Sequence, residues 1–508
     1  MVLQRAPKRA AVWGFTTPGS IVRVILDDSA ALVSNGDVNG TWRQVLPQTA
    51  GGGSAHTITI SNATTTIRLV DVLFGEVYLC GGQSNMAFSV SGMTNASAEA
   101  ARADSYSGVT GVRLFTVGQN RTDIRAPVPL EFFPSVEEGW QAASQASIAR
   151  GGEFGFFSAV CWEMGRTIHD GLGGGIPVGL ISSNWPGTAV QEWTPDSSYR
   201  TCCSLFPSGC TLGTQGSLYN EMIAPLAVGP MALAGAAWYQ GESNTVPTNP
   251  ALPFNAGSRF YACCFPAMIT AWRKSFADPE LYFSFVQLST WCNPDQSGIA
   301  PMRGQLGVPQ DEAGQMSAMT LPYVAYVTNA DHGNGCGIHP PDKQFPGMRL
   351  GRAALNLVYG QTAIIWNSPT YKSAFVAPVD RSTGELSVTI ALNDVGRDGL
   401  HLIYPYNQGK LDRSHTTCAS LEKPSLNETA TCGWAAIQVS DVWHNASITL
   451  TADGTAIELS VALEEWKRGD VEVVATATRY GYAPIPMMSV YDLSSDLPLL
   501  SWNRSVTI

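Results

Sequence analysis

Ser84 and His339 are the two side chains of this 508-residue sequence whose surroundings best fit nucleophilic catalysis. Ser84 lies in LCGGQSNMAF, where an apolar run ends at two glycines and the chain turns. A serine at the start of a helix has an amide that points into a site, and the helix dipole favours a developing negative charge. The same position is also typical of an ordinary N-cap serine, so this stretch alone leaves both interpretations open.

Histidine is the usual general base for a serine nucleophile. Two of the seven histidines, His332 and His339, follow the apolar run YVAYVTNA in a glycine-rich loop. His339 is the better placed, because a rigid Pro-Pro pair and then an apolar helical segment come after it. Asp331 ends the same run and is a candidate for the acid that orients the histidine. Either histidine alone is also typical of a surface loop.

Two further polar clusters follow apolar runs. WYQGESN contains Gln240, Glu242 and Asn244, whose polar groups need hydrogen-bond partners if they are buried, and such a cluster at a strand end suggests a site. An amide from Gln240 or Asn244 could donate to an oxyanion, and Glu242 could orient its neighbours. SNWPGT contains Trp185 and Gly187, where the glycine amide could be a second donor. A polar loop and a plain turn are the alternatives for these clusters.

The elements that must position these residues are predicted from the hydrophobic pattern. Between about residues 73 and 364, short apolar strand candidates alternate with helical stretches, which predicts an α/β domain with a mostly parallel sheet. Ligands bind such sheets at the carboxyl ends of the strands, where all four clusters lie. Short β segments precede and follow this region, so the predicted divisions are 1–72, 73–364 and 365–508.

Composition narrows the class of protein. The chain is 44% hydrophobic and only 14% charged, as in globular proteins with large cores, and its net charge of −11 argues against non-specific binding to nucleic acid or anionic membranes. It has no apolar run long enough for a membrane span. Cysteine pairs at zinc-finger spacing are missing, so we do not expect a structural zinc. A serine nucleophile with a histidine base requires no metal, and we expect no cofactor.

The cysteines and glycosylation sequons favour an oxidising, secretory route, and we expect a secreted or lysosomal protein. No signal peptide is visible, so we presume that it was removed or truncated. Eleven cysteines leave at least one thiol unpaired within the chain, and spacing suggests a Cys418–Cys432 disulfide. The seven sequons begin at Asn39, Asn62, Asn95, Asn120, Asn427, Asn445 and Asn503.

Taken in order, these motifs resemble the SGNH hydrolase superfamily and, within it, the sialate O-acetylesterases. The resemblance rests on DVLFGEVYLCGGQSNM (71–86), WYQGESN (238–244), IHPPDKQ (338–344) and the early MVLQ and VWGF. It implies a three-layer α/β/α domain flanked by antiparallel β segments. It also implies that Ser84 is the nucleophile, that His339 is the base, and that the N–H groups of Ser84 and Gly187 and a side-chain amide form the oxyanion hole.

Some positions depart from the superfamily pattern. Cys336 stands where many relatives have the triad Asp, so either Asp331 folds back to orient His339 or the pair acts as a dyad. Gln83 and Glu242 would support the site. A sialic acid carries a carboxylate, and Arg303, which follows the strand candidate YFSFVQLS, is the candidate cation for it. Trp185 is a further candidate for substrate binding.

Two alternatives to removal of acetyl groups from sialic acids stay open. The first is a deacetylase for another glycan, such as acetylated xylan or pectin, whose neutral sugar would need no arginine. The second is a non-catalytic glycan-binding protein on an esterase-like scaffold. The retained nucleophile, base and polar third cluster argue against the second alternative. The sequence does not predict the oligomeric state.

Overall fold

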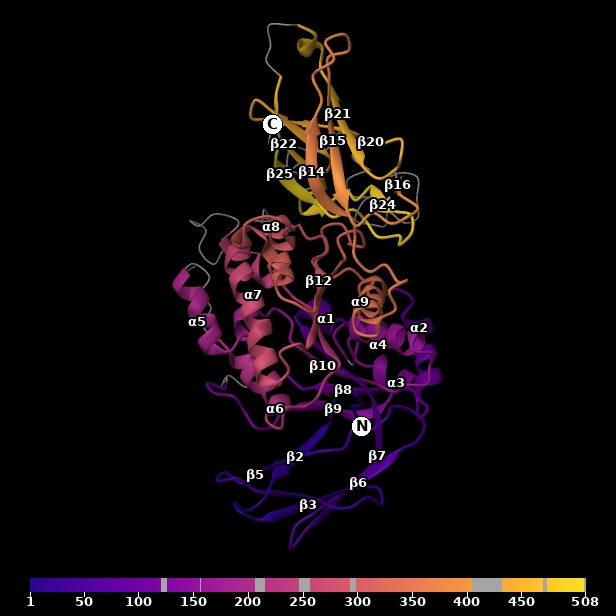
Figure 1. Ribbon diagram of the computed structural model, residues 1–508, viewed down its shortest axis with the longest axis vertical. Helices are drawn as coiled ribbons and strands as arrows, with labels where there is room; N and C mark the ends of the chain where they lie inside the picture. Colours follow the sequence, from indigo (N-terminus) through magenta and orange to yellow (C-terminus); the bar gives the residue numbers. More distant parts are fainter. Residues whose placement is uncertain are drawn as a thin grey trace.

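The computed structural model describes residues 1–119, 126–155, 157–205, 215–245, 256–292, 298–403, 432–468 and 473–506. The molecule is elongated, with a β unit at each end and an α/β domain between them (Figure 1). The N-terminal β unit lies at the end opposite to the C-terminal β domain (Figure 1).

A mixed central sheet forms the middle of the molecule, in the order β13-β12-β11-β7-β10-β8-β9. Every neighbouring pair from β13 to β8 is parallel, and β9 pairs antiparallel with β8 at one edge. The strands of the sheet are β7 (Thr66–Gly82), β8 (Val112–Val117), β9 (Val136–Ala142), β10 (Val178–Asn184), β11 (Gly235–Tyr239), β12 (Tyr282–Gln287) and β13 (Val324–Thr328).

Helices cover both faces of this sheet, which explains why its inner strands have no polar side (Figure 1). All residues of β11, β12 and β13 are buried. Helices α4 and α9 pack against each other on one side, and α5 and α7 lie on the other (Figure 1). The helices are α1 (Ser84–Ala87), α2 (Ala96–Ala103), α3 (Gln145–Ile148), α4 (Ala159–Gly171), α5 (Asp196–Leu205), α6 (Ala224–Ala227), α7 (Ala256–Ser275), α8 (Ile299–Arg303) and α9 (Gln344–Leu357).

Strand β7 belongs to both the N-terminal unit and the central sheet. Its first residues pair antiparallel with β6, and from Glu76 onwards it pairs parallel with β10. Asp71, with a φ of 53°, lies where the register between β6 and β7 shifts, and the last β6 pair is His56 with Val72. The predicted boundary between residues 72 and 73 therefore lies inside one continuous strand. The other N-terminal strands are β1 (Val2–Gln4), β2 (Ala11–Phe15), β3 (Ile21–Leu26), β4 (Leu32–Asn35), β5 (Thr41–Val45) and β6 (His56–Ser61).

The C-terminal β domain contains two antiparallel four-stranded sheets, β14-β15-β21-β20 and β19-β18-β22-β25. Alternate residues of β15 are buried, as expected for a strand with one face toward a core. The strands of these sheets are β14 (Thr370–Val376), β15 (Glu385–Asn393), β18 (Ala436–Val439), β19 (Val442–Asn445), β20 (Ser447–Leu450), β21 (Ile457–Ala462), β22 (Ala475–Tyr480) and β25 (Trp502–Ser505). Three shorter pieces, β16 (Leu400–Leu402), β23 (Ile485–Pro486) and β24 (Val490–Asp492), lie beside them, with β17 (Cys432–Gly433) paired to β23.

Disulfides join segments that are distant in the sequence. Three are described, and they are Cys80–Cys161, Cys202–Cys263 and Cys292–Cys336. The first ties α4 to the strand that leads to Ser84. Cys264 is a buried free thiol, as the odd number of cysteines requires. The predicted Cys418–Cys432 disulfide lies outside the described residues because Cys418 is among those not described.

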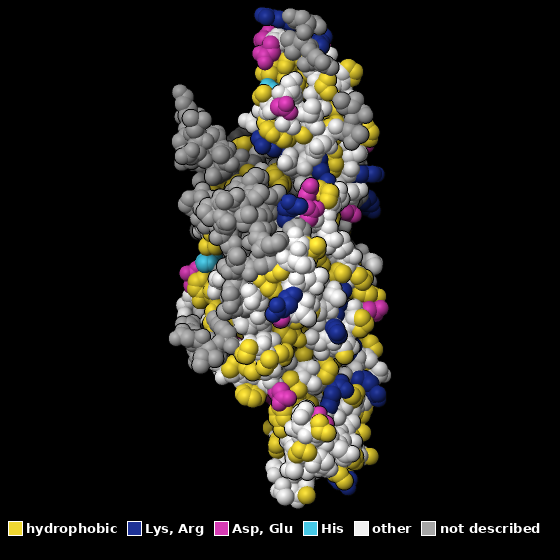
Figure 2. Space-filling view, turned by 90° about the vertical axis from the view of Figure 1, so that its left-hand side faces the viewer, with side chains coloured by type: hydrophobic (Ala, Val, Ile, Leu, Met, Phe, Trp, Pro, Cys, Tyr) yellow, Lys and Arg dark blue, Asp and Glu magenta, His cyan; other side chains and the backbone are white. Residues whose placement is uncertain are grey.

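Charged side chains are scattered over the face shown in Figure 2, between neutral and hydrophobic ones. Lys and Arg occur there singly or in small groups, and no broad patch of one sign covers the visible described atoms. Among the described helices, none has the length and apolar character to cross a membrane.

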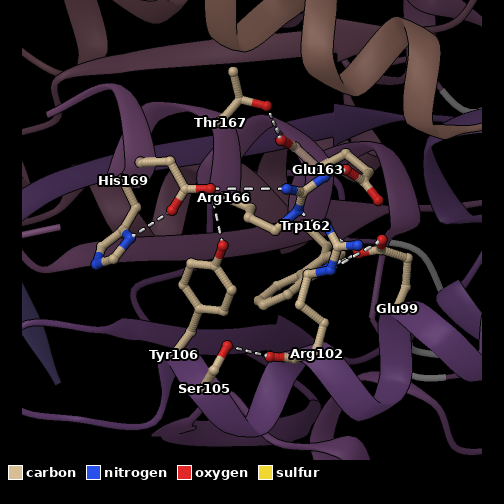
Figure 3. A network of polar contacts seen from close by, with 10 residues as sticks. Glu99, Arg102, Ser105, Tyr106, Trp162, Glu163, Arg166, Thr167 and His169 are labelled. Atoms are coloured by element: carbon tan, nitrogen blue, oxygen red, sulfur yellow. Dashed lines mark hydrogen bonds and ion pairs between the residues drawn. The ribbon is translucent and has the colours of Figure 1, made fainter. Parts of the chain in front are cut away.

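A buried ionic network holds α2 against α4, with Arg166 at its centre (Figure 3). Arg166 Nη2 contacts Glu163 Oε2 at 2.5 Å, and Arg166 Nε lies 3.6 Å from Glu99 Oε2. Burial raises the pKa of Glu163 to about 7 although Arg166 opposes this shift. The folded protein therefore keeps a proton on Glu163 over a pH range in which the unfolded chain has lost it.

A Glu163→Gln variant is expected to change the pH dependence of stability. A raised pKa in the fold means that Glu163 lowers the free energy of unfolding as pH rises from about 4.5 to about 7, by about 3 kcal/mol at most. The free energy of unfolding is measured with denaturant at several pH values for the wild type and the variant. The difference between the two, plotted against pH, should fall over this range. A difference that stays flat across that range would contradict the shifted pKa.

Candidate active site

Ser84 is the first residue of α1, directly beyond the end of β7. Gly82 has a φ of 144°, and a Cβ there would lie 2.2 Å from the Tyr239 carbonyl oxygen, so the turn requires glycine. The helix N-cap is Gln83, whose side chain makes no capping bond. Ser84 is therefore not an N-cap. Its buried hydroxyl lies 3.5 Å from Gln83 Nε2.

His339 lies in the loop between β13 and α9, and both of its neighbouring carbonyls are held by side chains. Asn85 Nδ2 donates to the Ile338 oxygen at 2.9 Å, and Lys343 Nζ donates to the Pro340 oxygen at 2.6 Å. His339 Nε2 is buried and has no hydrogen-bond partner among the described residues. Because Asn85 adjoins Ser84, the serine turn and the histidine loop are direct neighbours.

Glu242 and Lys343 meet through Asn85. Asn85 Nδ2 donates to Glu242 Oε1 at 2.5 Å, and Lys343 Nζ donates to Asn85 Oδ1 at 2.6 Å. All three side chains are buried. Burial raises the pKa of Glu242 and lowers that of Lys343 to about 7, and the attraction between the two groups opposes both shifts. This chain joins the ends of β7, β11 and β13, as predicted for a site at one sheet edge.

Gln240 connects the third polar cluster to the serine turn. Its Nε2 contacts Gln83 Oε1 at 3.0 Å, the Thr188 oxygen at 3.1 Å and Asn244 Oδ1 at 2.8 Å. Two amide hydrogens shared among three protein acceptors hold this side chain inside the network. The assignment of Gln240 as an oxyanion donor stays a prediction, and the structure gives it these structural contacts.

Asn244 connects the same cluster to the segment after β10. Its Oδ1 accepts from the Val190 N–H at 2.9 Å, and its Nδ2 donates to Gln191 Oε1 at 2.9 Å. Gly187, in the same segment, is exposed with a φ of 73°. Trp185 is half-buried, and its N–H donates to the Gly82 oxygen at 3.0 Å. The four sequence clusters are thus brought together, while the roles given to Gly187, Asn244 and Trp185 stay predictions.

Asp331 forms an ion pair with α9 in place of the expected contact with His339. Its carboxylate is fully buried, and its two oxygens lie 2.7 Å from Nη1 and Nη2 of Arg349. Burial raises the pKa of this carboxyl, but the Arg349 guanidinium outweighs it and holds the pKa well below its usual range. Its neighbour His332 stacks on Phe345 at a ring separation of 3.5 Å.

Arg303 is fully buried and does not serve as the substrate cation that its position suggested. Its guanidinium donates to the carbonyl oxygens of Leu288, Ser289, Ala483 and Pro484. Burial lowers the pKa of Arg303 to about 9. These bonds join the central domain to the C-terminal β domain, so the expectation is corrected to a structural role.

The imidazole of His339 is neutral over most of the pH range. Burial lowers its pKa to about 4, and the nearby positive charge of Lys343 lowers it further. Glu153 Oε1 lies 3.9 Å from the other ring nitrogen, Nδ1. A neutral histidine with an unpartnered nitrogen can accept a proton from a hydroxyl.

A Lys343→Met variant is expected to move the acid limb of kcat/KM to higher pH. Lys343 is charged below pH 7 and disfavours the imidazolium, so its removal should raise the pKa of His339. A pH profile from 3.5 to 7 measures the limb, and Lys343→Arg, which keeps the charge, is the matched control. An unchanged limb in Lys343→Met would refute this coupling.

Three residues of the site were missed in the sequence. Asn85 and Lys343 both stand inside motifs that drew attention, QSN and HPPDK, and their place in these motifs was the available signal. Glu153 lies in RGGEFG, far from the motifs, and no local pattern points to it. Its proximity to His339 exists only in three dimensions.

A buried serine at a strand-to-helix turn, joined through Asn85 to the loop that carries a neutral histidine, gives this α/β protein the layout of a hydrolytic enzyme. The family model "Carbohydrate esterase, sialic acid-specific acetylesterase" matches residues 75–339. The chain belongs to this family of carbohydrate esterases.

Curated relatives and a solved structure agree with this membership. The human sialate O-acetylesterase is 32% identical over 400 residues, covering 73% of this chain and 71% of the relative. The mouse sialate O-acetylesterase is 31% identical over 425 residues, covering 73% and 74%. A carbohydrate acetylesterase from Xanthomonas citri superposes with a TM-score of 0.73 at 24% identity, over 99% of this chain and 96% of that one, and shows the shared fold.

Proposed function

We propose that this chain removes O-acetyl groups from sialic acids through an acetyl-enzyme formed on Ser84. The observation that carries the proposal is the Asn85 side chain, which links the serine turn to the carbonyl beside His339. The substrate class follows from the human and mouse relatives, which are sialate O-acetylesterases.

The reaction begins when Ser84 Oγ attacks the acetyl carbonyl carbon and His339 Nε2 takes the hydroxyl proton. The N–H groups of Ser84 and Gly187, with a side-chain amide from Gln240 or Asn244, stabilise the oxyanion. The intermediate collapses, and the sugar hydroxyl leaves with the proton from His339. His339 then takes a proton from water as the water attacks the acetyl-enzyme, and it gives this proton to Ser84 Oγ as acetate leaves.

We also propose a finer description of the fold and a cellular compartment for the protein. The central domain is an SGNH-type three-layer α/β/α domain within residues 73–364, flanked by β units at 1–72 and 365–508. The protein is secreted or lysosomal. The described disulfides support an oxidising compartment for the folded chain.

Acetylated xylan or pectin is the competing substrate class. The arginine expected to bind the sialic acid carboxylate is Arg303, and its guanidinium is bonded to backbone carbonyls. A neutral glycan needs no such cation. The substrate class must therefore be decided by activity.

The test compares acetate release from O-acetylated N-acetylneuraminic acid and from acetylated xylan at matched acetyl concentrations. We expect a higher kcat/KM for the sialic acid, with Ser84→Ala as the inactive reference. Preference for xylan would overturn the substrate class and leave the mechanism standing. A folded wild-type protein inactive on both would overturn the proposed function.

A further inference from the structure

We infer that Glu153, whose carboxylate faces Nδ1 of His339 from the loop before α4, is the acid that orients the catalytic histidine. This inference rests on the proposed function, because it assigns a positioning residue to the Ser84–His339 mechanism. It replaces the open choice between Asp331 and a simple dyad with a residue that lies about 180 positions upstream in the chain.

The two nitrogens of His339 have different surroundings. Glu153 Oε1 lies 3.9 Å from Nδ1, while Nε2 is buried and has no hydrogen-bond partner among the described residues. A carboxylate at Nδ1 favours the tautomer with the proton on that nitrogen. Nε2 is then left with a lone pair for the Ser84 hydroxyl proton.

The Glu153 loop is fixed to the chain segment that follows the nucleophile. The Ser89 N–H donates to the Glu153 oxygen at 2.8 Å. The hydroxyls of Ser89 and Ser91 both donate to the Gly152 oxygen at 2.5 Å. Next to Glu153, the ring of Phe154 meets that of His339 edge-to-face at 5.1 Å. The backbone that carries Glu153 is therefore held beside the histidine, while the Glu153 side chain itself takes no part in these contacts.

The other acidic candidates have different partners. Asp331 is bound through both oxygens by Arg349. Cys336, at the position where many relatives have the acid, is in a disulfide with Cys292. Glu242 is bound to Asn85. Glu153 is thus the carboxylate among the described residues that the structure brings to the His339 ring.

The distance of 3.9 Å is longer than a hydrogen bond, and the half-exposed side chain has room to close it. The Glu153 side chain is 51% exposed, so a rotation about its terminal bonds meets little resistance. Positive charge develops on the imidazole only when Ser84 gives up its proton. Catalytic hydrogen bonds that are long in the free enzyme tighten in the enzyme–substrate complex. The Nδ1 proton stays on the histidine throughout the reaction. The carboxylate stabilises the imidazolium but does not accept this proton.

The test uses Glu153→Gln and Glu153→Ala in the full chain, assayed for acetate release from O-acetylated N-acetylneuraminic acid. We expect kcat to fall by a factor on the order of 10²–10⁴ with KM nearly unchanged. Sodium formate should restore activity to Glu153→Ala in a concentration-dependent way, because a free carboxylate can enter the exposed space left at Nδ1. Glu137→Gln, an exposed substitution on β9, is the matched control and should keep wild-type kcat.

Formate rescue is a result that loss of a merely structural side chain would not give. Wild-type kcat in Glu153→Gln, or a loss in Glu153→Ala that formate leaves unchanged, would overturn the inference. Ser84→Ala and His339→Ala are measured in parallel. If these two are inactive and Glu153→Gln is fully active, only the inference fails, whereas full activity in Ser84→Ala means that the proposed function itself fails.

Discussion

Replacement of Ser84 with alanine is expected to lower kcat for acetate release by a factor on the order of 10⁴–10⁶. The substitution removes the atom that forms the acetyl-enzyme, and the remaining oxyanion donors and binding contacts give only residual catalysis. Stability should change little, because the described contact of Ser84 Oγ is the long 3.5 Å approach of Gln83 Nε2. Steady-state kinetics and a thermal melt measure the two effects separately.

Covalent labelling makes this prediction independent of the substrate. A fluorophosphonate should modify wild-type protein at the peptide that contains Ser84, and Ser84→Ala and His339→Ala should stay unlabelled. Ser105→Ala, an exposed serine substitution on the surface, serves as the control and should label and turn over normally. Labelling at another serine, or near-normal turnover by Ser84→Ala, would show that the turn after β7 does not carry the nucleophile.

The elements of the central sheet could be predicted because burial on both faces leaves a clear local signal. YFSFVQ and VAYVT are short apolar runs, and both are fully buried strands. The separation of the N-terminal unit at residue 72 could not be predicted in the same way. Strand β7 changes its partners between Val72 and Glu76 without any break in the strand, and pairing partners are a property of the whole fold.

The meeting of the motifs could be predicted from one rule, because the ends of parallel strands share one sheet edge. The detailed contacts could not. Arg303 looked like a free cation, yet its acceptors Ala483 and Pro484 lie about 180 residues away in the sequence. Lys343 was not singled out in the sequence, yet it is fully buried against Asn85. Long-range partners decide the role of a polar side chain, and local spacing does not reveal them.

A second large effect is expected for Asp331→Asn, which should destabilise the fold by about 3–5 kcal/mol while leaving kcat within several-fold of wild type. The substitution removes the charge that compensates Arg349, and a buried unpaired guanidinium is costly. The depressed pKa of Asp331 means that its stabilisation is fully present at neutral pH and is lost progressively as pH falls from the usual range of an aspartate towards the depressed value. Denaturant unfolding at neutral pH measures the loss.

The double substitution Asp331→Leu with Arg349→Met separates the ion pair from its position in the core. Removing both charges leaves no unpaired ion, so the double variant should be less destabilised than Asp331→Asn. Substitutions of Asp331 and Glu153 should differ in their effects, since the former should change the stability of the fold and the latter should change kcat. If Asp331→Asn instead keeps its stability and loses several orders of magnitude in kcat, Asp331 orients His339, and its pairing with Arg349 would have to break during catalysis.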